Sequence, residues 1–318
     1  MGVRSFWIIL RAQKEAGLIF DIDARYALFE VVVLILFALC LRHAARRESD
    51  LPRGWHVGEL LGGLLFGLLL EWVNVEFVTG YHYGRFVLML GSIPIGVGLG
   101  WAVIIYTAML ATDRWGLPEA DRPFADALLA LNIDLGMDAV AFRTGMWTWE
   151  FYAPERRWTA DWYGVPFGNF YGWMLVVFLY STWMRLFRQW VRRRTAWRAP
   201  LTLLAPIVSV ALSEVVLYFA LQWAMQMGKA GTPAITFFLA PLTIALIAVA
   251  IGIARIRAAG SAEPIAWIVP LVFHVFFLAM LFTPLPDRPA ALVLISLVML
   301  ALGLGVHWAI ERQRLSKS

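Results

Sequence analysis

Two aspartates, Asp134 and Asp138, stand four residues apart within an apolar stretch of the chain. This spacing places both carboxylates on one face of an α-helix. A carboxylate at the centre of a bilayer costs roughly 2.5–3.5 kcal/mol on insertion scales, so such residues mark functional sites by default. Two like charges this close do not ionise easily together, and the pair is therefore suited to serve as a protonated acid beside a charged base. The competing interpretation is a structural pair that joins helices or binds Arg143.

Aromatic and polar residues crowd the chain just after the aspartates. The segments Gly145-Met-Trp147-Thr-Trp149 and Tyr163-Gly-Val-Pro166 precede Asn169-Phe-Tyr-Gly-Trp173. The tryptophans either face a substrate or form an ordinary interfacial aromatic belt. Asn169 lies about one turn inside a predicted span and needs a polar partner there, either in a site or between helices. The candidate substrate-binding residues of this region are Trp147, Trp149, Tyr163, Asn169 and Trp173.

A third carboxylate, Glu71, follows Gly63 and Gly67 at four-residue intervals. Small residues let helices approach closely, so Glu71 should face protein rather than lipid. We expect Glu71 to act with the aspartates as a third catalytic residue. The alternative is a structural carboxylate bonded to a neighbouring helix. The remaining substrate-binding candidates follow along the chain and are Glu76, Tyr81, His82, Tyr83 and Trp101.

Other ionisable residues carry weaker signals. Only one histidine, His82, follows these carboxylates closely, and a metal site with three or four protein ligands is not spelled out, so no metal is expected. Glu214 is an isolated carboxylate in an apolar segment, with less claim to a function than the clustered acids. His274 and His307 are lone and are expected to be core or interface residues. The run 192–194 of three arginines is interpreted as a cytoplasmic contact for lipid phosphates.

The composition is that of a membrane protein. Hydrophobic residues make up 61% of the chain and charged residues 15%, whereas ordinary soluble domains have about 45–50% and about 25%. The mean hydropathy is +0.70. The net charge of +5 resides in loops, which argues for a membrane topology and against nucleic-acid binding. The single cysteine, Cys40, excludes an internal disulfide.

Long apolar runs, separated by turn residues, predict an all-α polytopic helical bundle with about nine transmembrane helices. Residues 1–25 are expected to form an interfacial N-terminal segment. Residues 26–310 would form a single transmembrane domain, and residues 311–318 a cytoplasmic tail. The predicted spans are 26–42, 57–77, 93–112, 123–143, 165–184, 201–227, 233–254, 264–283 and 289–310.

Loop charges predict the orientation of these spans. Most loop arginines follow the odd-numbered spans or lie near the C-terminus, which places those loops and the C-terminus in the cytoplasm. Four basic residues before the first span run against this assignment. The protein is therefore expected in the inner (plasma) membrane. The ends of the second and fourth spans and the start of the fifth then meet at the non-cytoplasmic face.

These motifs resemble the carotenoid biosynthesis membrane family that includes the CruF-type carotenoid hydratases and bisanhydrobacterioruberin hydratase. The resemblance rests on the segments 134–138, 145–149, 163–166 and 169–173, with weaker echoes at 81–84 and at Trp101. Ile133 and Ala139 stand where the family pattern has Trp and Pro. Motif-level likeness covers about residues 71–175, and the last four spans agree only in general character.

The resemblance implies addition of water to the terminal isopropylidene double bond of a linear carotenoid, with no cofactor. A desolvated acid suits protonation of an alkene, a carboxylate suits activation of the water, and aromatic faces suit the intermediate cation. The expected partners are the lipid bilayer and the carotenoid, and could include other enzymes of the pathway. Two alternatives stay open: another isoprenoid- or lipid-modifying membrane enzyme, and a non-enzymatic carotenoid-binding or transport protein.

Overall fold

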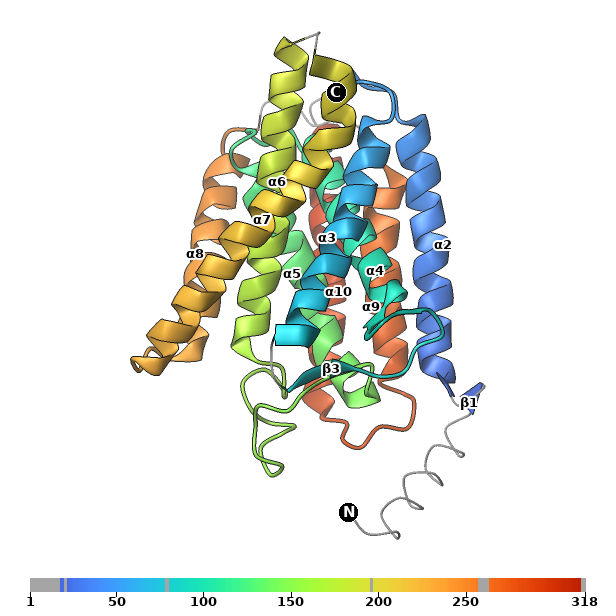
Figure 1. Cartoon of the computed structure of the whole chain (residues 1–318), viewed down its shortest axis with the longest axis vertical. Helices are drawn as coiled ribbons and strands as arrows, with labels where there is room; N and C mark the ends of the chain where they lie inside the picture. The colour runs from blue at the N-terminus through green and yellow to red at the C-terminus, as the bar shows by residue number, and fades with distance from the viewer. Residues whose placement is uncertain (1–17, 20–21, 78–79, 195–196, 257–262, 316–318) are drawn as a thin grey trace.

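The computed structural model describes residues 18–19, 22–77, 80–194, 197–256 and 263–315. Within these ranges the chain forms nine α-helices, and the structure is an all-α polytopic membrane bundle (Figure 1). Each helix coincides with one predicted span to within a few residues, apart from the C-terminal end of the fifth. The helices are α2 (Ala24–Arg46), α3 (Trp55–Phe77), α4 (Ile95–Arg114), α5 (Arg122–Thr144), α6 (Phe167–Arg193), α7 (Arg198–Lys229), α8 (Ala234–Ile253), α9 (Pro264–Met280) and α10 (Ala290–Leu315).

Helices α4 and α5 form the centre of the bundle. Helix α4 packs against α2, α3, α5 and α9, and α5 packs against α4, α6, α8, α9 and α10. Six helices are long and apolar enough to cross a membrane, namely α2, α3, α4, α7, α8 and the part of α10 up to Ala309, and α9 is a shorter apolar helix. Helices α5 and α6 carry more charge, and six of their charged side chains are buried, namely Asp126, Asp134, Asp138, Arg143, Arg185 and Arg188.

Helix α6 corrects the predicted boundary of the fifth span. The sequence placed Arg185 and Arg188 in a cytoplasmic loop, but α6 continues to Arg193 and both side chains are buried. Carboxylates on other helices bind both guanidinium groups, which offsets the cost of burying the charges. The predicted interfacial segment lies mostly outside the described residues.

Close packing of α3 on α4 depends on glycine. A Cβ atom at Gly63 would lie 3.2 Å from Ala102 Cα, and one at Gly67 would lie 2.6 Å from Trp101 Cβ. The small residues therefore allow the two helices to touch, as their spacing predicted. Glu71, one turn further along α3, is buried against protein.

Short strands connect the helices at one end of the bundle. Strand β3 (Tyr81–Tyr83) pairs antiparallel with β6 (Trp147–Trp149), so that Tyr81 lies opposite Trp149 and Tyr83 opposite Trp147. Two further pairs are β1 (Leu18–Ile19) with β2 (Ile22–Asp23) and β4 (Met89–Leu90) with β5 (Ile93–Pro94). The β3–β6 pair joins the loop after α3 to the loop after α5, and Figure 1 shows it at the end where α6 begins.

Candidate active site

Asp134 and Asp138 are buried in the middle of the bundle and share one hydrogen-bond donor. Their exposed fractions are 0% and 2%. The Nδ2 of Asn169, in the first turn of α6, lies 2.6 Å from Asp138 Oδ2 and 3.3 Å from Asp134 Oδ2. Among the described residues, Asp134 Oδ1 has no hydrogen-bond partner. A single amide therefore links both carboxylates of α5 to α6.

Arg143 does not pair with the aspartates. Its guanidinium donates to the carbonyl oxygens of Ala139, Tyr163 and Trp158 and lies 3.3 Å from the carboxylate of Asp287. These contacts fasten the loop after α5 to the end of that helix. The aspartates therefore do not form an ion pair with Arg143, and the interpretation that they bind this arginine is wrong.

Glu71 is held by donors from two other elements. Trp101 Nε1 of α4 donates to Glu71 Oε1 at 2.8 Å. The hydroxyl of Tyr81 lies 3.3 Å from Glu71 Oε2 and 2.8 Å from the hydroxyl of Tyr83, and its one proton serves one of them at a time. Burial, reinforced by the charge of Glu71, raises the pKa of Tyr81 and of Tyr83 well above the usual value, so both remain protonated donors near neutral pH.

A cavity of about 1240 Å³ brings most of the predicted site residues together. Its wall is mainly apolar and aromatic, and it contains three carboxylates, Glu71, Asp138 and Glu214. Asp134 is not part of the wall and lies behind it, connected through Asn169. The predicted residues that line the cavity are Glu71, Tyr81, Tyr83, Trp101, Asp138, Trp147, Trp149, Asn169 and Trp173.

Aromatic rings in the wall form pairs. The ring centroids of Trp101 and Trp173 lie 4.0 Å apart. Tyr81 stacks on Trp149 with centroids 5.7 Å apart, as the strand register requires. Ring faces attract cations through their quadrupole, so this wall is suited to a positively charged intermediate.

Three predicted substrate-binding residues lie outside the cavity wall. Glu76 is exposed, and its Oε1 lies 3.4 Å from Ser92 Oγ. His82 is also exposed and lies 3.8 Å from Glu150, because alternate residues of a strand face opposite sides. Tyr163 packs its ring against Trp162 and offers its carbonyl oxygen to Arg143.

Comparison with known families adds to this geometry. The model of a family described as "Carotenoid biosynthesis protein" matches residues 29–247. The chain belongs to this family. The matched region runs from α2 into α8, extends well beyond the motifs at 71–175, and contains every described cavity-lining residue except Phe273 of α9. Searches of curated proteins and of solved structures found no match.

Membership in this family supports a role for the protein in carotenoid biosynthesis. Among its described residues, no group of three or more His, Cys, Asp or Glu is arranged to hold a metal ion. The functional groups that line the described cavity are carboxylates, amides, phenols and indoles.

Helix α7 contributes cavity residues that the sequence analysis did not select. Glu214 was considered only as an isolated carboxylate, yet it lines the same cavity as Asp138. Tyr218 and Gln222 follow at four-residue intervals and line it as well. Their spacing was a visible signal, but it could not show that α7 turns this face toward the site.

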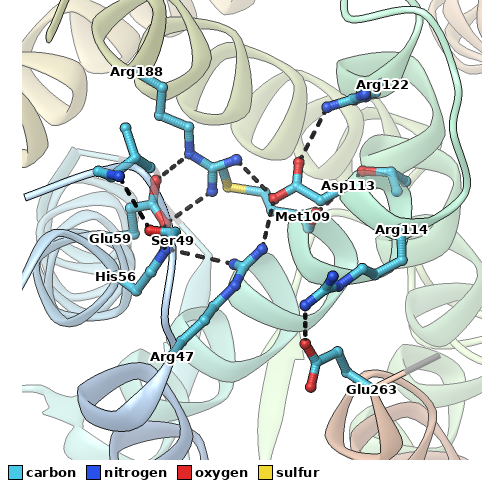
Figure 2. Close-up of polar contacts among 12 residues, drawn as sticks. Arg47, Ser49, His56, Glu59, Met109, Asp113, Arg114, Arg122, Arg188 and Glu263 are labelled. Carbon is cyan, nitrogen blue, oxygen red and sulfur yellow. Dashed lines mark hydrogen bonds and ion pairs between the residues drawn. The ribbon is translucent and has the colours of Figure 1, made fainter. Parts of the chain in front are cut away.

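A second polar cluster lies at the opposite end of the bundle (Figure 2). Asp113 of α4 receives four arginines: Arg185 at 2.5 Å, Arg188 at 2.8 Å, Arg47 at 3.3 Å and Arg122 at 3.6 Å. Figure 2 shows Arg47, Arg122 and Arg188 converging on this carboxylate from different elements. The sequence analysis missed this cluster because its members are far apart along the chain.

Further carboxylates compensate the cluster. Glu59 binds Arg188 at 2.5 Å and accepts from Trp55 Nε1 at 2.7 Å, and Asp126 binds Arg185 at 2.9 Å. The ion pairs connect α3, α4, α5, α6 and the residue that follows α2. We interpret this network as a clamp that fixes the helices, since each of these arginines has a carboxylate partner.

Proposed function

We propose that the protein is a carotenoid hydratase that adds water to the terminal isopropylidene double bond of a linear carotenoid and gives a tertiary alcohol. The observation that carries this proposal is the Asp134–Asn169–Asp138 arrangement beside a large aromatic cavity. Membership in the carotenoid biosynthesis family supplies the substrate class.

The proposed reaction begins with proton transfer to the alkene. The inner carbon of the isopropylidene group takes the proton, and the outer carbon becomes a tertiary cation. The oxygen of a water molecule then bonds to that carbon, and a carboxylate takes one of the water protons. One carboxyl group loses a proton and a carboxylate gains one, and the passage of that proton back to the first group restores the starting state. No cofactor takes part.

The position of Asp138 supports its role as the acid that meets the substrate, since it lies in the cavity wall. Asp134 lies behind Asp138, where it can return a proton to Asp138 after the transfer to the substrate. Glu71 faces the same cavity and is held by Trp101 and Tyr81, which suits a carboxylate that orients water. In this assignment Trp147 and Trp149 shield the cation from premature capture and stabilise it.

We further propose that the protein lies in the inner (plasma) membrane with its C-terminus in the cytoplasm. The site end of the bundle, marked by β3, would then face away from the cytoplasm. An extended carotenoid is about as long as the ~30 Å hydrocarbon core, so its end can reach this depth while the polyene remains in lipid.

Expression of the chain in a bacterium that makes lycopene, followed by mass analysis of the pigments, tests the proposal. A gain of one water per reacting end supports it. An oxidised or otherwise altered isoprenoid would instead indicate a different lipid-modifying enzyme. Pigment that co-purifies unchanged would indicate a carotenoid-binding or transport protein. A chain carrying Asp138→Asn, expressed to the same level, is the matched control.

A further inference from the structure

Three polar residues of α7 form one row along the cavity. Glu214, Tyr218 and Gln222 are spaced by four residues, so they lie on the same face of the helix. All three line the cavity that also contains Glu71 and Asp138. We call these three residues the α7 row. The residues that flank it on the same wall, Leu217 and Leu221 among them, are apolar.

Glu214, the deepest member of the α7 row, is costly where it stands, whereas Tyr218 is 55% exposed at the rim of the cavity. Glu214 Oε1 is inaccessible to solvent, and no described residue hydrogen-bonds to it. An uncompensated polar group in an apolar environment is destabilising, and carboxylates within membrane spans mark functional pathways by default. A polar ligand inside the cavity would supply the hydrogen bond that Glu214 Oε1 lacks.

The row leads from the membrane face to the interior. Helix α7 ends on the same side of the bundle as β3, and the turn that follows it contributes Thr232 to the cavity wall (Figure 1). Gln222 lies nearer that end of the helix, and Glu214 lies about 12 Å further back along the helix axis at 1.5 Å per residue. Polar groups thus occur at successive depths along one side of the cavity.

No comparable row occurs among the described residues of the opposite wall. Strands β3 and β6 present stacked rings at this end, as in the Tyr81–Trp149 pair. Trp101 and Tyr81 contact Glu71, and the amide nitrogen of Asn169 donates to the aspartates. Helix α7 therefore offers small polar molecules a continuous run of side chains along one side of the cavity.

We propose that the α7 row binds a file of water molecules that supplies the site from the membrane face, with Glu214 holding the innermost water. This inference rests on the proposed function, because hydration of an alkene consumes one water in each turnover. It assigns α7 a role in delivering and positioning water, and leaves protonation of the substrate to the aspartates.

The test is oxidative labelling of the purified full chain by short hydroxyl-radical pulses in ¹⁸O-water. Met137 is the reporter, because it lines the cavity and is buried. The wild type should incorporate ¹⁸O at Met137, and Gln222→Leu should reduce that incorporation several-fold. Gln226→Leu is the matched control, since Gln226 is an exposed residue of the same helix outside the cavity wall, and it should leave the labelling unchanged.

Tyr218→Phe and Glu214→Leu provide independent variants should Gln222→Leu fail to fold, and both should reduce the labelling of Met137. Absence of ¹⁸O at Met137 in the wild type, or equal labelling in all folded variants, would overturn the water file. If labelling depends on the row but no hydrated product forms, the water file stands and the proposed function fails. If hydrated product forms while the labelling of Met137 is the same in all variants of the row, the proposed function stands and the water file fails.

Discussion

The amide nitrogen of Asn169 lies 2.6 Å from Asp138 Oδ2, and the same nitrogen also reaches Asp134. Asn169 sits in the first turn of α6, directly after the loop that carries the tryptophans of β6. One side chain therefore sets the position of both candidate catalytic carboxylates relative to the aromatic wall.

Replacing Asn169 with leucine should slow catalysis without unfolding the protein. The substitution removes a hydrogen bond to a carboxylate, which is worth about 1.5–3 kcal/mol, or about 10–100-fold in rate if it acts on the transition state. Turnover of purified Asn169→Leu measures this effect. Asn132→Leu is the control, because Asn132 bonds Met299 and His274 outside the cavity and should affect stability more than turnover. Equal losses of turnover in both variants would argue against a special role for Asn169.

Two glutamates of α3 allow a matched comparison. Glu71 is buried in the cavity wall, whereas Glu76, five residues further along, is exposed. Glu71→Gln should lower turnover by about 10²-fold or more, the scale of a catalytic acid or base. Glu76→Gln should leave turnover close to that of the wild type. Product formed per mole of folded protein is the measurement, and a stronger effect of Glu76→Gln would contradict the site.

The clamp at the other end of the bundle should govern stability rather than chemistry. Asp113→Asn removes the carboxylate on which four arginines converge, and breaking a buried ion pair costs about 3–5 kcal/mol. Asp50→Asn breaks the ion pair between Asp50 and Arg192. The Asp50 side chain is 62% exposed, so the loss should cost only about 0–1 kcal/mol. Thermal unfolding in detergent compares the two variants. Similar unfolding midpoints would show that the network does not act as a clamp.

The proposed orientation is open to a direct test. Reporter fusions after residue 318 should report a cytoplasmic location, and reporters inserted within 154–160, in the loop after β6, should report the opposite side. An external C-terminus would move the site end of the bundle to the cytoplasmic face. The geometry of the cavity would then stand, and the assigned direction of the water file would reverse.

The apolar runs predicted the nine described helices because each span is long and its ends carry turn residues. The C-terminal end of α6 was misplaced for a definite reason. Arg185 and Arg188 look like loop residues until their partners are known, and Asp113 lies 72 and 75 residues away in the chain. Local sequence carries no sign of such a pairing.

The candidate site also has features that the local sequence predicted and features that it could not predict. The spacing of Asp134 and Asp138 predicted a shared helix face, and the glycines before Glu71 predicted that it faces protein. The pairing of β3 with β6 and the turn of α7 toward the cavity depend on contacts between distant segments. The sequence could therefore name Tyr81 as a candidate residue but could not predict that its ring stacks on Trp149. For the same reason, the α7 row was not among the predicted site residues.

The aspartates themselves provide the most direct test of the mechanism. Asp138→Asn and Asp134→Asn keep the shape of the side chains and remove the acid, and each should lower the rate by about 10²–10⁴-fold. Asp287→Asn, which changes a carboxylate outside the cavity wall, is the control and should retain most activity. The measurement is hydrated carotenoid formed per mole of purified, folded protein. Near-complete loss in both aspartate variants with retained folding is the predicted result, and near-normal turnover in both would contradict the acid–base mechanism.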